Sequence, residues 1–126
     1  MQQARYTRLY ADDHGESHFA DVDVGLAPID FAPPAPPLNV ATLYPAAQCF
    51  LLAGPADWGG DVPHPTPRRQ LFCLLQGETE VTASDGETRR FRPGDVLLLE
   101  DTHGKGHATR GVGGGSFLLL GVALAE

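Results

Sequence analysis

Short segments in which apolar and polar residues alternate recur along the chain. In the segment 17–26, for example, Val22 and Val24 alternate with Asp21 and Asp23. A period of two residues indicates a strand with one buried and one exposed face. Comparable segments predict further strands at residues 5–10, 40–44, 47–53, 70–76, 78–83, 87–92, 95–100, 107–110 and 116–124. No stretch keeps an apolar period of 3.6 residues over three turns, so no long helix is expected.

Turn signals separate these predicted strands. An Asp85-Gly86 step lies between two alternating segments, which is a strong signal for a hairpin, and Pro93-Gly94-Asp95 marks the next turn. Glycine (15 residues) and proline (11 residues) are abundant but scattered between the apolar runs, as turns require. Many short strands joined by turns predict an all-β sandwich or barrel.

Length and charge narrow the classes of function. A chain of 126 residues fits one domain with a modest core of its own. The net charge of -7 and the pI near 5.0 argue against nucleic-acid binding, which requires a basic surface. The amino-terminal residues lack the apolar core of a signal peptide, and the longest apolar run, 117–125, is far shorter than the roughly 20 residues of a membrane helix. We therefore expect neither nucleic-acid nor membrane partners.

The two cysteines bear on the cellular location. Cys49 and Cys73 both fall within apolar runs, and free cysteine is among the most buried residue types. Two buried thiols are therefore expected rather than a disulfide framework, with a single bridge between them as the alternative. Free thiols predict a reduced, cytoplasmic protein.

A proline-rich segment at residues 28–37 cannot be a central strand, because proline donates no backbone hydrogen bond. The favoured interpretation is a stiff connector that lies across the barrel surface, held by the apolar anchors Phe31 and Leu38. The alternative is a ligand for an SH3-like partner.

Four residues in the segment 64–77 have a characteristic spacing: His64, Thr66, Gln70 and Gly77. This spacing resembles the first motif of the cupin family, in which a His-x-His pair is followed by a glutamate and a glycine. Thr66 stands in place of the second histidine, and Gln70 stands in place of the glutamate. The match of spacing extends from the first histidine to the closing glycine.

A looser match to the second cupin motif follows. Gly104 and His107 fit its Gly-x-x-His part, whereas Thr102 replaces a proline and Gly111 replaces an asparagine. The Pro93-Gly94-Asp95 turn stands where this motif opens, although the first glycine is two residues further away than in the family. The two regions span about half of the chain.

The resemblance implies a double-stranded β-helix, the jelly-roll barrel of the cupins, as a single domain over residues 1–126. Residues 58–126 would form the motif core, and residues 1–57 would supply N-terminal strands and the proline-rich wrap. Cupins commonly dimerise through their N-terminal strands, so a homodimer is also expected. They hold a divalent metal inside the barrel with three histidines and a glutamate.

Alternation along a strand indicates which side chains would share this pocket. Even-numbered residues of an unbroken strand face the same way. On the first strand these residues are His64, Thr66, Gln70 and Phe72, and on the second they are His103, Lys105, His107 and Thr109.

Two departures from the family pattern weaken the expected metal site. Thr66 offers only a neutral hydroxyl, and Gln70 offers a neutral carbonyl oxygen in place of a carboxylate. The expected metal ligands are therefore His64, Gln70 and His107, with His103 able to replace the missing histidine. Such donors suit iron, manganese, zinc, nickel or copper. The alternative is a metal-free pocket that binds by hydrogen bonds.

The side chains expected to contact a bound small molecule are Thr66, Arg68, Gln70, Phe72 and His103. An arginine beside a pocket can clamp a carboxylate or phosphate. The favoured interpretation of Arg68 and Arg69 is that they pair with acids such as Glu100 or Asp101.

Three hypotheses of function follow. The first is a small-molecule-binding cupin with a degenerate or atypical metal centre, whose ligand would be small, with an anion as one option. The second is a metal-dependent enzyme of the oxygenase, isomerase or decarboxylase type. The third is a sensor or storage module without catalysis. The fold alone does not choose among them, and no residue is assigned a catalytic role.

Overall fold

β-strands make up the secondary structure of residues 2–126, the part of the chain that the computed structural model describes. The strands are β1 (Gln3–Ala11), β2 (Ser17–Gly25), β3 (Ala27–Ile29), β4 (Leu38–Val40), β5 (Ala46–Gly54), β6 (Gly59–His64), β7 (Gln70–Gln76), β8 (Glu78–Ala83), β9 (Thr88–Phe91), β10 (Val96–Glu100), β11 (His107–Val112) and β12 (Phe117–Leu124). The all-β prediction is confirmed. Within residues 2–126, no helix is long and apolar enough to span a membrane.

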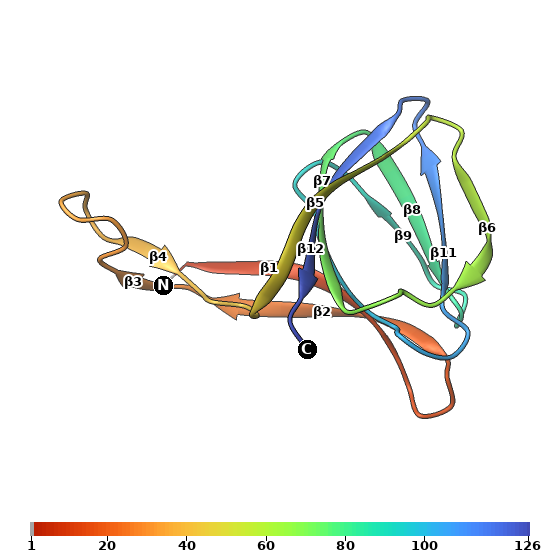
Figure 1. Ribbon diagram of the computed structural model, residues 1–126, viewed down its shortest axis with the longest axis horizontal. Helices are drawn as coiled ribbons and strands as arrows, with labels where there is room; N and C mark the ends of the chain where they lie inside the picture. The colour runs from red at the N-terminus through yellow and green to blue at the C-terminus, as the bar shows by residue number, and fades with distance from the viewer. Residues whose placement is uncertain (1) are drawn as a thin grey trace.

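Two facing sheets form a jelly-roll barrel (Figure 1). The larger sheet has the order β2-β1-β10-β7-β12-β5, and the smaller has the order β6-β11-β8-β9. The strand pairs in both sheets are antiparallel, except that β1 runs parallel to β10. Strands distant in sequence are therefore neighbours, and β6 and β11 lie side by side in the smaller sheet.

The core lies between the two sheets because successive residues of each strand alternate in direction. On β8, for instance, Val81 and Ala83 are buried, whereas Glu80 and Thr82 are only partly buried. Leu74 of β7, Leu97 of β10 and other apolar residues meet them from the larger sheet. Removing one leucine side chain from water contributes about 1.5–3 kcal/mol. These inward positions stabilise the barrel and also form the walls of its interior.

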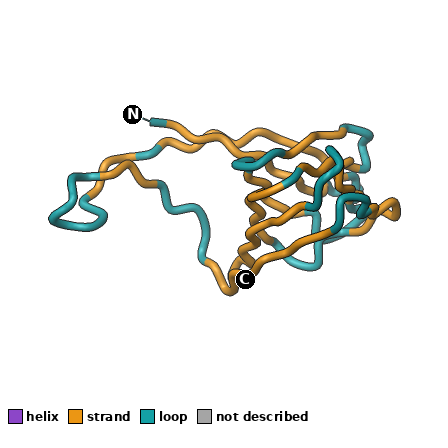
Figure 2. The backbone as a smooth tube through the Cα atoms, turned by 90° about the horizontal axis from the view of Figure 1, so that it is seen from above, coloured by secondary structure: helices purple, strands orange, loops and turns teal. Residues whose placement is uncertain are grey.

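The proline-rich segment does not lie across the barrel. Strands β3 and β4 form a separate two-stranded sheet that projects from the barrel beyond the ends of β1 and β2 (Figures 1 and 2). We call residues 27–40 the arm. Phe31 is 63% exposed and Leu38 is 54% exposed, so the prediction that they anchor the segment on the barrel is wrong. Proline excludes this segment from the ladders of the barrel sheets, and nothing in the sequence compels it to fold back.

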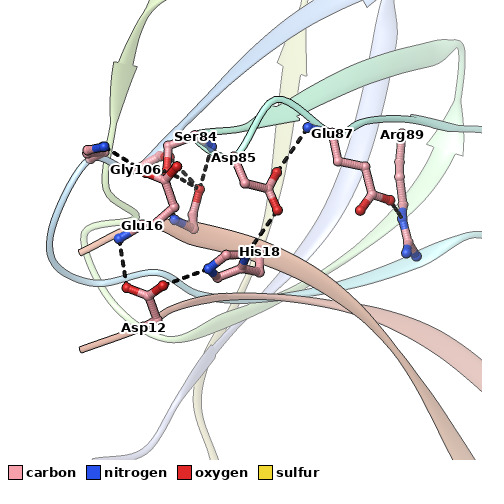
Figure 3. A network of polar contacts seen from close by, with 10 residues as sticks. Asp12, Glu16, His18, Ser84, Asp85, Glu87, Arg89 and Gly106 are labelled. Atoms are coloured by element: carbon pink, nitrogen blue, oxygen red, sulfur yellow. Dashed lines mark hydrogen bonds and ion pairs between the residues drawn. The ribbon is translucent and has the colours of Figure 1, made fainter. Parts of the chain in front are cut away.

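A polar cluster joins the β1–β2 turn to the β8–β9 turn (Figure 3). The Nε2 atom of His18 lies 2.7 Å from Oδ2 of Asp12, and its Nδ1 atom lies 2.9 Å from Oδ2 of Asp85. Hydrogen bonds to these two carboxylates raise the pKa of His18. The hydrogen bond with His18 is also the main reason that the pKa of Asp12 is lowered to about 2. We call these three residues the His18 clasp.

A second contact beside the clasp holds the start of β11. The hydroxyl of Ser17 donates to the carbonyl oxygen of Gly106 at 2.7 Å, and the backbone N–H of Ser84 donates to the same hydroxyl at 2.7 Å (Figure 3). Ser17 is fully buried, so these bonds are protected from water. They connect the N-terminal hairpin to the residue that precedes His107.

The two cysteines are free thiols, which agrees with the expected absence of a disulfide. The prediction that both are buried is wrong. Cys49 is exposed on β5, and Cys73 on β7 is partly buried. Strand β5 forms one edge of the larger sheet, so the apolar character of the surrounding sequence did not guarantee burial.

Candidate ligand-binding site

A cavity of about 330 Å³ lies between the two sheets. Most of the residues around it are apolar. They include Leu52, Trp58, Phe72, Leu74, Val81, Phe91, Leu97, Leu99, Phe117 and Leu119. Ligand pockets commonly combine such apolar walls with a few polar groups that orient the bound molecule.

Polar side chains line the cavity from both sheets. His64 ends β6, Gln70 begins β7 and His107 begins β11, and all three line the cavity. His107 is the register partner of His64 across the two strands, and their ring centroids are 5.4 Å apart. The structure therefore brings together the three residues expected to bind a metal. Thr66 and Phe72 also line this cavity, as expected.

Gly106 makes the approach of these strands possible. It has a φ of +73°, and a Cβ atom built there would lie 2.1 Å from the carbonyl carbon of His64. Only glycine has no side chain to clash at this point and adopts this φ readily. The backbone next to His107 can therefore pack directly against His64.

Thr66 and Gln70 form a directed hydrogen-bond chain. The Thr66 hydroxyl donates to the carbonyl oxygen of Arg68 at 3.0 Å and accepts from Nε2 of Gln70 at 2.9 Å. Both side chains are buried. Because the single hydroxyl proton is used on a carbonyl, Gln70 must donate to Thr66 through its NH₂ group. The loop between β6 and β7 thus interrupts the expected unbroken strand yet keeps both side chains at the cavity.

His107 has a buried carboxylate partner that sequence reasoning did not identify. Its Nδ1 atom lies 2.5 Å from Oδ2 of Asp101, and the residues are 5% and 0% exposed. The other carboxylate oxygen, Oδ1, is buried without a hydrogen-bond partner in the described part of the chain. Asp101 directly follows β10, next to Glu100, and no sequence signal distinguishes the two acids. Glu100 and Asp101 were both named as acids with which the arginines could pair, and the partner of Asp101 is His107 instead.

His64 is the exposed member of the polar group. Its Nδ1 atom lies 2.9 Å from the carbonyl oxygen of Pro65. A carbonyl can only accept, so this ring nitrogen carries a proton. The residue belongs both to the cavity lining and to the protein surface.

The structure does not bring His103 to the cavity. The β11 strand begins only at His107, and His103 is exposed in the preceding turn. Gly104 there has a φ of +83° and packs on Gly15, where an added Cβ would lie 2.3 Å from the Gly15 carbonyl oxygen. This turn breaks the strand period, so the prediction that His103 and Lys105 share a strand face with His107 is wrong.

Neither Arg68 nor Arg69 lines the cavity. Arg68 is exposed. Arg69 forms an ion pair with Glu100 at 2.8 Å, and Arg8 binds the other oxygen of the same carboxylate. Burial is the largest single influence on Glu100 and raises its pKa. The hydrogen bonds and charges of Arg8 and Arg69 together outweigh burial, so the pKa of Glu100 is lowered. The favoured interpretation, pairing with an acid, holds for Arg69.

The donor set for a metal is limited. Among the described residues, no group of three or more His, Cys, Asp or Glu side chains is arranged to hold a metal ion. The predicted ligands offer two imidazoles and the neutral side-chain oxygen of Gln70, and Asp95 is the one carboxylate among the described residues that line the cavity. Transition metals are held more strongly by histidine and by charged ligands than by a neutral amide. The residues present therefore do not form the complete ligand set of a tight metal centre.

Comparison with known proteins gives a consistent picture. Residues 59–110 match a family model described as an EutQ-like cupin domain. The cupin domain of Cnp3 from Schizosaccharomyces pombe superposes with a TM-score of 0.53 at 17% identity, covering 86% of this chain and 79% of that one. A putative ethanolamine utilization protein Q from Salmonella typhimurium is 18% identical over 98% of both chains, with a TM-score of 0.42. The search of curated proteins found no match.

Proposed function

We propose that this chain, which has the cupin fold and matches a cupin family model over residues 59–110, binds a small molecule in the cavity between its two sheets. One observation carries the proposal: a largely apolar cavity of about 330 Å³ is lined by a few polar side chains, among them His64, Gln70 and His107. The apolar walls supply affinity, and the polar group supplies orientation. This division suits an amphipathic ligand better than a highly charged one.

A ligand screen by NMR tests this proposal. Methyl groups of Leu74, Leu97 and Leu119 face the cavity, whereas Leu124 belongs to the cluster on the outer face of the larger sheet. We expect small amphipathic compounds to shift the cavity methyl signals and to leave Leu124 unchanged. Shifts confined to Leu124, or no shifts with any compound, would contradict binding in the cavity.

A metal-dependent enzyme is the second candidate, and the proximity of two imidazoles favours it. His64 and His107 have ring centroids 5.4 Å apart, and Gln70 lines the same cavity from the facing sheet. Iron, manganese, zinc, nickel or copper held there would act as a Lewis acid or activate oxygen. The weak donor set places this candidate second, together with a sensor or storage role.

Elemental analysis separates these candidates. The protein should be prepared without a metal-binding tag, offered each metal and dialysed. Near-stoichiometric metal that is lost in His64→Ala would support the second candidate, because His64 is exposed and its removal spares the buried Asp101–His107 pair. A metal content below about one tenth per chain would leave ligand binding by the apolar cavity as the supported function.

We also propose that the protein is a cytoplasmic homodimer. Its two free cysteines suit a reducing compartment. The arm exposes Ile29, Phe31 and Leu38, at 46%, 63% and 54% respectively. A second copy that covers these side chains would remove them from water.

A further inference from the structure

The direction of hydrogen bonds around the polar end of the cavity limits what the ligand head group can be. We propose that this site selects a small molecule with an apolar body and a hydrogen-bond-donating head, an ammonium or a hydroxyl group, and that it rejects carboxylates. The inference rests on the proposed ligand-binding function and names the chemical class of the ligand. It follows from three side chains that each present an acceptor atom at the cavity.

His107 is the first of these side chains. Its Nδ1 atom is 2.5 Å from the buried Asp101 carboxylate, which can only accept when ionised. The proton of the neutral imidazole is therefore on Nδ1, and Nε2 bears a lone pair. The side chain lines the cavity while Nδ1 is directed away toward Asp101, so Nε2 is the polar atom available to a ligand.

Gln70 is the second. Its NH₂ group donates to Thr66, whose hydroxyl proton is bonded to the Arg68 carbonyl oxygen. This chain fixes the orientation of the amide, because the reverse orientation would set an acceptor against the Thr66 oxygen that has no proton to give. The Oε1 carbonyl oxygen of Gln70 is then a free acceptor, beside the one amide N–H that Thr66 does not use.

His64 is the third. Its Nδ1 atom donates to the carbonyl oxygen of Pro65 at 2.9 Å. The neutral ring therefore also has its lone pair on Nε2. With the His64 and His107 ring centroids 5.4 Å apart, both lone pairs are available at the same end of the cavity. Acceptors therefore outnumber donors in this group by three to one, and the one donor is the remaining N–H of Gln70.

The charges around the cavity act in the same direction. Among the described residues, the lining includes no lysine or arginine that could hold an anion. The Asp101 carboxylate lies directly behind His107 with 0% exposure, and the whole chain has a net charge of -7. Asp95 also lines the cavity, so a carboxylate ligand would meet acceptors and negative charge together. The hydroxyls of Thr79 and Thr109 also line the cavity, but a hydroxyl can donate or accept and does not discriminate.

A matched series of compounds tests the proposal. Benzylamine, benzyl alcohol, toluene and benzoate share an aromatic body and differ in the head group. At about pH 8, above the ordinary pKa of histidine, NMR titration should show benzylamine and benzyl alcohol binding at least about five-fold more tightly than toluene, which corresponds to one net hydrogen bond. Benzoate should bind most weakly. The tighter binder of benzylamine and benzyl alcohol identifies which donor group the site prefers.

Other results would overturn the proposal. Benzoate binding as tightly as the amine, or toluene binding as tightly as both donors, would contradict donor selection while leaving ligand binding itself intact. Failure of all four compounds, toluene included, would overturn both the selection and the proposed function.

Two further measurements probe the atoms directly. Gln70→Leu should lower the affinity for benzylamine and benzyl alcohol, relative to toluene, by about five-fold. Gln76→Leu makes the same change at an exposed position of the same strand and should leave this ratio unchanged. The ¹⁵N signals of His64 and His107 report which ring nitrogen bears the proton without any ligand. Both should be in the Nδ1–H form, and an Nε2–H form at His107 would contradict the proposal.

Discussion

At the scale of single residues, the sequence did not reveal which polar side chains are buried or which partners they have. The spacing of His64, Gln70 and Gly77 pointed to two residues that line the cavity, His64 and Gln70, because this motif lies within a short stretch of the chain. The role of Asp101 depends on a contact inside the folded barrel, where it is fully buried against His107. An acid at the end of an apolar strand is ordinarily exposed, so sequence alone favours the wrong environment for it.

The Asp101–His107 pair should contribute strongly to stability. Asp101→Ala would leave the buried Nδ1–H of His107 without an acceptor, and we expect a loss of about 1–3 kcal/mol in the free energy of unfolding. Urea denaturation followed by circular dichroism measures this change. Asp13→Ala, at an exposed position, should change the value by less than about 0.5 kcal/mol. Equal effects of the two substitutions would show that the buried pair is not stabilising.

The His18 clasp predicts a pH dependence whose sign is fixed by its pKa shift. The folded-state pKa of His18 is raised above the ordinary 6.5, because Asp12 and Asp85 stabilise the protonated ring. Its contribution to stability is therefore fully present below the unfolded pKa and is lost as pH rises through the raised folded pKa. Denaturation midpoints of the wild type and His18→Gln should differ most at about pH 5–6 and converge at higher pH.

A matched control is available on the same turn. The side chain of His14 is exposed, so His14→Gln should follow the wild type across this pH range. A gap between wild type and His18→Gln that widened as pH rose would contradict the assigned role of the clasp.

At the scale of elements, periodicity predicted most strands but misplaced the ends of those that carry the site. The alternation at 17–26 and 78–83 corresponds to β2 and β8. The segments 65–69 and 101–106 are loops, although their even-numbered residues were expected to share strand faces. Long-range contacts decide these positions, since Gly104 packs on Gly15 and Gly106 packs on His64. A pattern in one segment carries no information about such a partner.

Two glycines with similar backbone angles should therefore respond differently to alanine. Gly94 and Gly106 have φ values of +96° and +73°, but an added Cβ meets nothing within 4 Å at Gly94 and meets His64 at 2.1 Å at Gly106. Gly94→Ala should cost only the backbone strain, about 1–2 kcal/mol. Gly106→Ala should cost more in the same denaturation assay and should also shift the NMR signals of His64 and His107. Equal losses for both variants would contradict close packing at Gly106.

At the scale of the whole molecule, the barrel was predictable and the arm was not. Turn spacing and the two motifs indicate a jelly roll, and the two-sheet topology agrees. The proline-rich segment was expected on the barrel because burial of Phe31 and Leu38 within one chain is the simplest way to shield them. Instead the arm projects from the barrel (Figure 2), leaving those side chains accessible to a second chain.

The proposed homodimer makes the arm the most informative region to alter. Replacing Phe31 or Leu38 with aspartate would place a charge where apolar contact with the second copy is expected, and such desolvation is costly unless the charge is paired. Light scattering at micromolar concentration should therefore show a dimer for the wild type and a monomer for the variants. The arm contributes no residue to the barrel core. The variants should therefore unfold at the same denaturation midpoint as the wild type when both are monomeric, at a protein concentration too low for the dimer to form. Val62→Asp, on exposed β6 of the barrel, is the matched control and should remain dimeric. A monomeric wild type, or a dimer lost in Val62→Asp but kept in the arm variants, would contradict an arm-mediated interface.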